Sequence, residues 1–116
     1  MSFKKLKLRI KKNEGFSNKP YKDQLGYFTI GYGHLIKKNE NKYFRNNYEN
    51  DYFKQLFEKD FSIAVRQYNN FFYKKKFNKV EKEVLIEMFY QLGPQGVLKF
   101  KKMLYYLEKK QKHMTC

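Results

Sequence analysis

Apolar residues recur at every third or fourth position in several parts of the chain, and this spacing predicts amphipathic helices. The first predicted helix spans residues 3–14, with Leu6 and Ile10 on one side. Gly15 follows it as a helix-ending glycine. We expect such apolar stripes to form core rather than a cofactor site, because nothing polar converges within them.

A long second helix is predicted to begin after Asn46 or Asn47, either of which can cap it, and to extend to about Asn69. Its apolar stripe consists of Tyr52, Phe53, Leu56, Phe57, Phe61, Ala64, Val65 and Tyr68. A third helix is predicted to follow Asn78, which forms a capping-box pattern with Glu81 three residues later.

The inward face of this third helix is predicted to carry Val80, Val84, Leu85, Met88, Phe89 and Leu92. The helix should end at Gly93, because glycine commonly follows the last turn. Pro94 then fits the first turn of a final helix that includes Val97 and Phe100.

Between residues 19 and 36 the pattern changes to short extended segments of Tyr, Phe and Ile, separated by a proline and glycines. We expect two or three antiparallel strands, a sheet too small to stand alone, which must therefore pack against a helix. The polar residues 37–47 that follow are the best candidate for a boundary between two lobes.

The predicted fold class is therefore α+β, in a single domain over residues 1–116. A small sheet lobe at about 15–46 is joined by the long helix to a mostly helical lobe. That second lobe is formed by residues 1–14 and 47–116.

The formal net charge of +15 indicates attraction to polyanions such as nucleic acid, an anionic membrane surface or anionic cell-wall polymers. Of the 26 basic residues, all but Arg9, Arg45 and Arg66 are lysines, which argues against sequence-specific nucleic-acid reading by arginine. A basic module that binds nucleic acid or membrane remains a competing interpretation, although the aromatic residues follow helix stripes rather than an exposed face.

The single cysteine, Cys116, allows neither an internal disulfide nor a thiolate metal cluster, and we expect no metal and no cofactor. No apolar run approaches the roughly 20 residues of a membrane span. The basic N-terminal segment lacks the features of a secretory signal. We therefore expect a monomer that is made in the cytosol and needs another route to act outside it.

Residues 14–34 carry the candidate chemistry, with two carboxylates, Glu14 and Asp23, and the hydroxyl of Thr29. Hydrolysis of a sugar–sugar bond needs one carboxylic acid to protonate the leaving oxygen and a second carboxylate across the sugar. Glu14 has apolar neighbours that favour its protonated form, whereas Asp23 lies beside Lys22 and solvent. Thr29 is expected to help Asp23 place a water, as in an inverting enzyme.

The string Glu14-Gly15, Tyr21-Lys22-Asp23, Gly26-Tyr27, Thr29-Ile30-Gly31 and Gly33-His34 resembles the signature of the phage-type lysozymes, or endolysins, the muramidase family of glycoside hydrolases. Further likeness lies in Leu56-Phe57, Asp60 and Ala64-Val65-Arg66, and in Phe89-Tyr90-Gln91-Leu92-Gly93 with Gly96-Val97. The resemblance implies a lysozyme-like fold and hydrolysis of the β-1,4 bond between N-acetylmuramic acid and N-acetylglucosamine in peptidoglycan. It also implies lysis of a host cell from within.

The resemblance assigns roles to individual residues. Glu14 would be the proton donor, Asp23 the partner carboxylate and Thr29 the residue that assists the water. Sugar contacts would come from Leu35, Tyr90 and Gln91. His34 is expected to be structural and to pair with Asp60 across the lobes, since histidine commonly pairs with a carboxylate.

One departure from the family leaves an alternative open. The family normally continues, past the point where this sequence stops, with helices that carry a Trp- and Arg-rich segment, so the resemblance implies a C-terminally shortened member. The alternative is therefore a truncated lysozyme-like protein that binds glycan with weak catalysis or none.

Overall fold

The computed structural model describes residues 3–114, with the backbone alone at 103–104 and 107–114. Cys116 lies outside the described residues. The chain divides into two compact units, residues 1–63 and 64–116. The helix α3 (Asn50–Phe71) belongs in part to each. The predicted division into a sheet lobe and a helical lobe stays a prediction.

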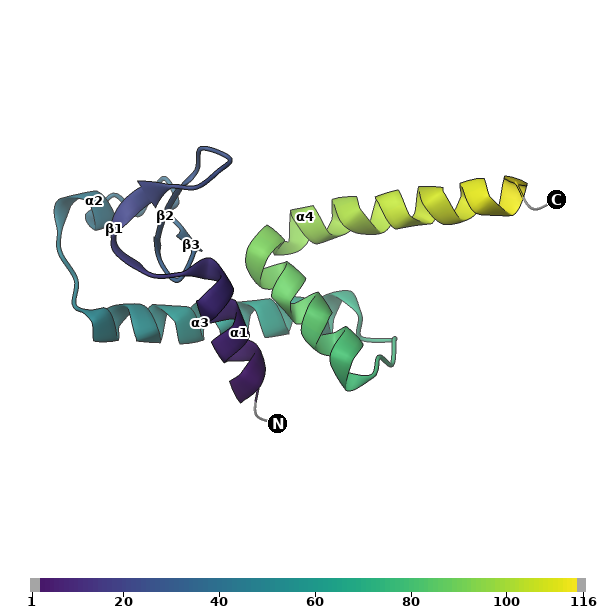
Figure 1. Ribbon diagram of the computed structural model, residues 1–116, viewed down its shortest axis with the longest axis horizontal. Coiled ribbons are helices and arrows are strands. Elements are labelled where there is room, and N and C mark those ends of the chain that lie inside the picture. The colour runs from purple at the N-terminus through teal and green to yellow at the C-terminus, as the bar shows by residue number, and fades with distance from the viewer. Residues whose placement is uncertain (1–2, 115–116) are drawn as a thin grey trace. The chain divides into compact units, whose positions relative to one another are not determined.

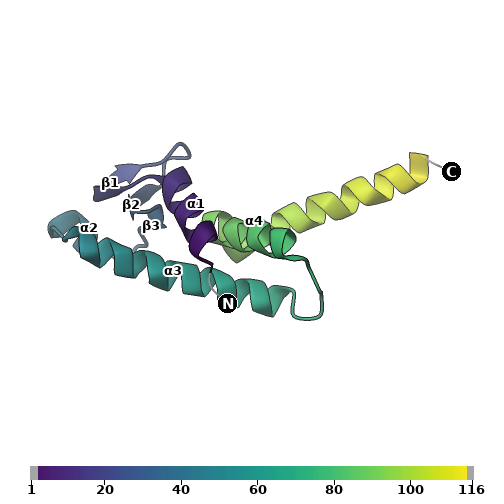
Figure 2. The same ribbon diagram turned by 60° about the horizontal axis from the view of Figure 1, so that its bottom comes forward.

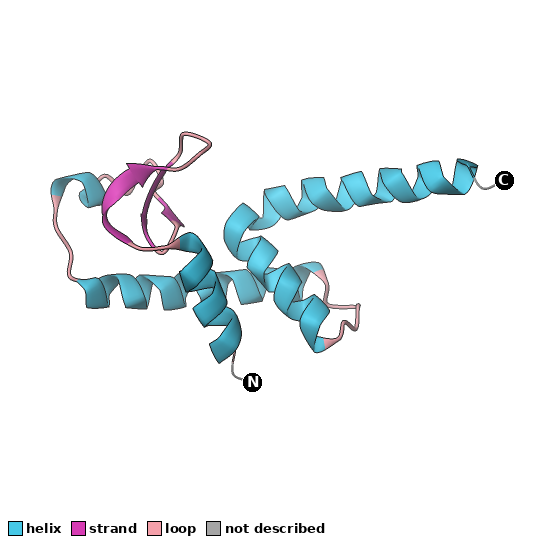
Figure 3. Ribbon diagram, viewed as in Figure 1, coloured by secondary structure: helices cyan, strands magenta, loops and turns pink. Residues whose placement is uncertain are grey.

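The first unit contains three antiparallel strands between helices, so the predicted α+β class is confirmed (Figures 1 and 3). The sheet order is β1-β2-β3, with an irregularity in the pairing of β1 with β2. In chain order the elements before α3 are α1 (Lys4–Glu14), β1 (Ser17–Lys22), β2 (Phe28–Gly31), β3 (His34–Leu35) and α2 (Lys42–Arg45).

Helix α1 packs across the first half of α3 (Figure 2). Its apolar side chains Leu6 and Ile10 are fully buried, as the periodicity predicted. On its flank the Lys7 ammonium lies 2.8 Å from a carboxylate oxygen of Glu58. The Lys11 ammonium lies 4.8 Å from the centre of the Phe57 ring. Apolar burial and charged flanking contacts thus hold α1 in one position against α3.

The sheet rests on α3 through a glycine. Gly31 has a φ of +67°, and a Cβ there would lie 3.0 Å from Cδ1 of Phe53. A larger residue would force the strand and the helix apart. Ile30, Tyr43 and Phe53 form the core cluster at this contact. The expectation that the small sheet needs a helix to pack against is therefore confirmed.

The region between the sheet and α3 differs from the prediction. The predicted polar connection contains the short helix α2, and Asn46 ends that helix, with its N–H donating to the Lys42 carbonyl. Helix α3 begins at Asn50, where the Tyr52 N–H donates to the Glu49 carbonyl. The prediction that Asn46 or Asn47 caps the long helix is wrong, because the extended backbone at Asn46 follows one helix and does not start the next.

In the second unit, helix α4 (Lys79–Met114) begins with the predicted capping box. The Asn78 side chain accepts the Glu81 N–H at 2.8 Å, and the Glu81 carboxylate accepts the Asn78 N–H at 3.1 Å. The helix is broken at Gly93, which has a φ of 70° and a ψ of 177°, and Pro94 follows. The predicted stop and restart are confirmed.

The inward face of α4 was predicted wrongly in part. Val80 is 70% exposed, Val84 is 48% exposed and Leu92 is 52% exposed, whereas Ile86 and Phe89 are buried. The Phe89 ring lies 5.5 Å from that of Phe71 and 6.3 Å from that of Phe72. These contacts with the last residue of α3 and the residue after it turn the Ile86–Phe89 side inward and leave the competing apolar stripe outside. Over the described residues, no helix has the length and apolar character needed to span a membrane.

Candidate active site

Glu14 is the last residue of α1, and the chain leaves the helix at Gly15 with a φ of 73°. Its half-buried carboxylate lies against the turn between β2 and β3, where Gly33 has a φ of +80°. A Cβ at position 33 would overlap Oε2 of Glu14. Two glycines therefore place this carboxylate, one by ending the helix and one by leaving room at the turn.

Asp23 opens the turn between β1 and β2 and is fixed by backbone hydrogen bonds. Its Oδ1 accepts the N–H groups of Leu25 and Tyr27, each at 2.9 Å. Its own N–H donates to the Tyr27 carbonyl at 2.8 Å. Among the described residues, none donates a hydrogen bond to Oδ2. One oxygen of Asp23 thus holds the turn, and the other is left for a further partner.

Thr29 lies in the central strand, opposite Tyr21 of β1 and Leu35 of β3. It is only 6% exposed, and its hydroxyl donates to the Tyr21 carbonyl at 3.3 Å. The strand register therefore places Thr29 across from a residue that precedes Asp23 by two positions. All three candidate catalytic residues, Glu14, Asp23 and Thr29, belong to the first unit.

The predicted sugar contacts fall in both units. Leu35 is half-exposed on β3 beside Thr29, so its position is open to a ligand. Tyr90 and Gln91 lie on α4 in the second unit, Tyr90 half-buried and Gln91 exposed. The sugar-binding roles of these three residues stay predictions.

Comparison with known families decides what kind of protein carries these residues. The family model described as phage lysozyme matches residues 11–116. The chain belongs to this family. As a phage lysozyme family member it is a glycosidase that hydrolyses peptidoglycan. No curated protein matches the chain. The match includes every candidate catalytic residue.

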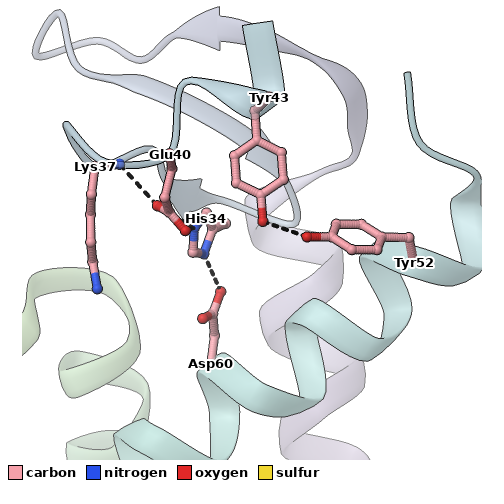
Figure 4. Close-up of polar contacts among 6 residues, drawn as sticks. All are labelled: His34, Lys37, Glu40, Tyr43, Tyr52 and Asp60. Atoms are coloured by element: carbon pink, nitrogen blue, oxygen red, sulfur yellow. Dashed lines mark hydrogen bonds and ion pairs between the residues drawn. The ribbon is translucent and has the colours of Figure 1, made fainter. Parts of the chain in front are cut away.

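Three polar side chains, from His34, Glu40 and Asp60, contact one another beside the sheet (Figure 4). We call them the His34 cluster. The His34 Nδ1 lies 2.7 Å from Oδ2 of Asp60, so the predicted pair is present. On the other side, His34 Nε2 lies 3.1 Å from Oε1 of Glu40. The Lys37 N–H also donates to Oε1 of Glu40, at 3.0 Å. The cluster ties β3 and the following loop to α3.

Sequence reasoning missed Glu40. It is the one acidic residue in the predicted connection 37–47, which is otherwise lysine- and asparagine-rich, and this isolation was the available signal. Among the described residues, no group of His, Cys, Asp and Glu side chains is arranged to hold a metal ion.

The contacts within the His34 cluster favour the charged forms of His34 and Glu40. Burial lowers the pKa of His34, but the hydrogen bonds and charges of Asp60 and Glu40 outweigh it and raise this pKa above the ordinary 6.5. Burial likewise raises the pKa of Glu40, but the Lys37 N–H and His34 outweigh it and lower this pKa below the ordinary 4.5. The contacts of His34 with Asp60 and Glu40 therefore favour its imidazolium form.

A pair of tyrosines adjoins the cluster. The Tyr43 hydroxyl lies 2.7 Å from that of Tyr52 on α3, and the Tyr43 ring stands edge-on to His34 at 5.8 Å (Figure 4). Burial and the bond to Tyr52 raise the pKa of Tyr43, so the Tyr43 hydroxyl stays neutral. Of the pair, it is Tyr43 that contacts the His34 cluster, through the His34 ring.

Proposed function

We propose that this protein cleaves the β-1,4 bond between N-acetylmuramic acid and N-acetylglucosamine in peptidoglycan, with inversion at the anomeric carbon. One observation carries the proposal: within the stretch matched by the lysozyme family, Glu14 lies against a glycine turn and Asp23 keeps Oδ2 free of backbone donors among the described residues. An acid and a base on opposite sides of a sugar are what this reaction requires.

The proposed reaction balances with these residues alone. The Glu14 carboxylic acid gives its proton to the glycosidic oxygen while the bond from that oxygen to C1 of N-acetylmuramic acid breaks. A water oxygen bonds to C1 from the opposite face and loses a proton to Oδ2 of Asp23. The Thr29 hydroxyl helps to place this water. Solvent then returns a proton to Glu14 and removes one from Asp23.

We further propose that the protein is an endolysin, made in the cytosol of a bacterial host and released to the cell wall. The net charge of +15 supports this role, because it attracts the protein to anionic wall polymers.

The identity of the broken bond is tested by mass spectrometry of fragments released from purified sacculi and reduced with borohydride. We expect the reduced end to be muramitol. Fragments that end in reduced N-acetylglucosamine would contradict the proposed bond. Binding to sacculi with no fragment released would favour the alternative, a lysozyme-like protein that binds glycan without cleaving it.

The stereochemistry is tested separately, by proton NMR during the first minutes of digestion of a soluble chitooligosaccharide or glycan fragment. Inversion of a β bond yields the α anomer first, before mutarotation mixes the two. Initial release of the β anomer would show retention and would remove the proposed role of Asp23 as a base.

A further inference from the structure

The first unit contains a surface pocket of about 350 Å³, beside the start of β2 and the segment 43–47. Its lining consists of Asn18, Lys19, Pro20, Phe28, Tyr43, Phe44, Arg45, Asn46 and Asn47. Phe28 lines it, whereas the next residue, Thr29, belongs to the opposite face of β2, because successive strand residues point to opposite faces. The pocket is therefore distinct from the candidate active site.

The charged residues that line the pocket, Lys19 and Arg45, are both basic. Lys19 and Arg45 are exposed, and neither forms an ion pair with any side chain that the structure describes. A third cation, the Lys22 ammonium, lies 5.3 Å from the centre of the Phe28 ring. None of the lining residues is acidic. The pocket is thus set up to attract an anion.

The remaining lining suits a sugar or polyol. The Phe28 and Phe44 rings meet edge to face at 5.1 Å and remain 41% and 49% exposed. Exposed aromatic faces pack well against the C–H groups of a saccharide. The side-chain amides of Asn18, Asn46 and Asn47 can both donate and accept hydrogen bonds, as hydroxyl and acetamido groups require.

We propose that this pocket binds an anionic group carried on a sugar or polyol, with Arg45 and Lys19 holding the anion and Phe28 and Phe44 holding the carbon skeleton. The volume lies at the small end of ligand pockets, about 300–1,000 Å³, and so suits one such unit. A single-stranded nucleic acid fits less well, because two rings at 88° to each other offer no platform for successive stacked bases.

A cell wall contains two anionic groups that are carried on a sugar or polyol: the phosphate of a polyol-phosphate polymer and the carboxylate of muramic acid. The wall as the source rests on the proposed function, whereas anion binding by the pocket does not.

The test is a ¹⁵N-NMR titration of the Glu14→Gln chain, in which binding is observed without turnover. The probes are glycerol 1-phosphate, N-acetylmuramic acid and neutral N-acetylglucosamine. We expect saturable shifts of the Phe28 and Phe44 amides with at least one anion, at an affinity about tenfold or more above that of the neutral sugar. Whichever anion binds more tightly identifies the source. Shifts of the Gly33 amide would instead show binding at the candidate active site.

Matched variants decide whether the pocket's cations are responsible. Arg45→Gln and Lys19→Gln should each weaken anion binding about tenfold, whereas Lys38→Gln removes an exposed charge outside the lining and should leave it unchanged. Equal binding of the neutral sugar, no saturation with either anion, or equal losses in all three variants would overturn the proposal. If oligothymidylate shifts the Phe44 amide at a higher affinity than either anion, the proposal is overturned, and the pocket binds nucleic acid instead. If the protein binds an anion in this pocket but does not hydrolyse cell walls, only the proposed function is contradicted.

Discussion

Two pairs of carboxylates in the first unit have very different surroundings. Asp60 and Glu40 face the two nitrogens of one histidine, and Glu40 also accepts a backbone N–H from Lys37. Glu14 and Asp23 instead lie next to backbone, Glu14 against the Gly33 turn and Asp23 with Oδ1 bound to two N–H groups. The first pair shares one histidine, whereas the second pair lies beside turns of the sheet.

This difference separates carboxylates that tie the sheet to α3 through His34 from carboxylates that lie at turns of the candidate active site. The His34–Asp60 contact joins residues 26 positions apart, on β3 and α3, so removing it should loosen the packing of the sheet on α3. The contacts of Asp23 are local turn contacts, and they leave one oxygen for a reacting group. Substitutions in the first group should therefore change stability, and substitutions in the second should change activity.

The largest effect is expected for Glu14→Gln. The amide keeps the size of the side chain but has no acidic proton to give, so hydrolysis of purified peptidoglycan should fall about 10²- to 10⁴-fold. Loss of turbidity measures the rate, and thermal unfolding should show that the variant still folds. Glu49→Gln, at an exposed carboxylate of the same unit, is the control and should remain active. Equal rates for the two variants would remove Glu14 from the mechanism.

His34→Asn should have the opposite effect, a loss of stability with no loss of activity. It leaves the Asp60 and Glu40 carboxylates without their shared cation, and the loss of two charge-assisted hydrogen bonds should cost about 1.5–3 kcal/mol of unfolding free energy. Urea denaturation measures this loss, and the rate per folded molecule should be unchanged. A much smaller cost in His34→Asn/Asp60→Asn than the sum of the single variants would confirm direct coupling. Additive costs would contradict it.

The same cluster should make stability depend on pH. The folded-state pKa of His34 is raised above 6.5, so its contribution is complete below pH 6.5 and is lost as pH rises through the raised value. The folded-state pKa of Glu40 is lowered below 4.5, so its contribution is complete above pH 4.5 and is lost as pH falls through the lowered value. The stability difference between wild type and His34→Asn should therefore be largest between pH 4.5 and 6.5. A difference independent of pH would rule out a charged histidine.

Much of the fold could be predicted because its signals are local. Gly15 and Gly93 end helices with positive φ values, and Asn78 with Glu81 forms a cap from residues three positions apart. The inward side of α4 could not be predicted in the same way. Two apolar stripes compete there, and the rings of Phe71, at the end of α3, and of Phe72, which follows it, decide between them.

The candidate site shows the same limit. The roles of Glu14 and Asp23 came from an ordered string of residues within one short segment, which a sequence displays directly. Glu40 was missed because its contact with His34 depends on how the chain turns between β3 and α2. The pocket at Arg45 was missed for a similar reason, since its residues come from three separate segments, 18–20, Phe28 and 43–47, that only the fold brings together.

Gly33→Ala tests whether backbone geometry positions Glu14. The added Cβ would overlap the Glu14 carboxylate, so this carboxylate must move, and we expect about a tenfold loss of activity. The positive φ should also cost about 1–2 kcal/mol of stability. Gly26→Ala is the matched control, because Gly26 has a φ of +88° but no atom within 4 Å of the added Cβ. It should lose similar stability and keep most of its activity. Equal activity losses would point to backbone strain alone.

Thr29 lies between the two kinds of behaviour, because it is buried like a core residue and yet is proposed to place the reacting water. In Thr29→Val the loss of a neutral, 3.3 Å hydrogen bond should cost no more than about 1 kcal/mol in urea denaturation. The rate of peptidoglycan hydrolysis should fall further, about tenfold, because the hydroxyl that orients the water is gone. Thr29→Ser keeps the hydroxyl and should keep most of the rate even though it loses a buried methyl group. If the valine variant hydrolyses as fast as the serine variant, Thr29 belongs with the stabilising residues, and Asp23 alone must place the water.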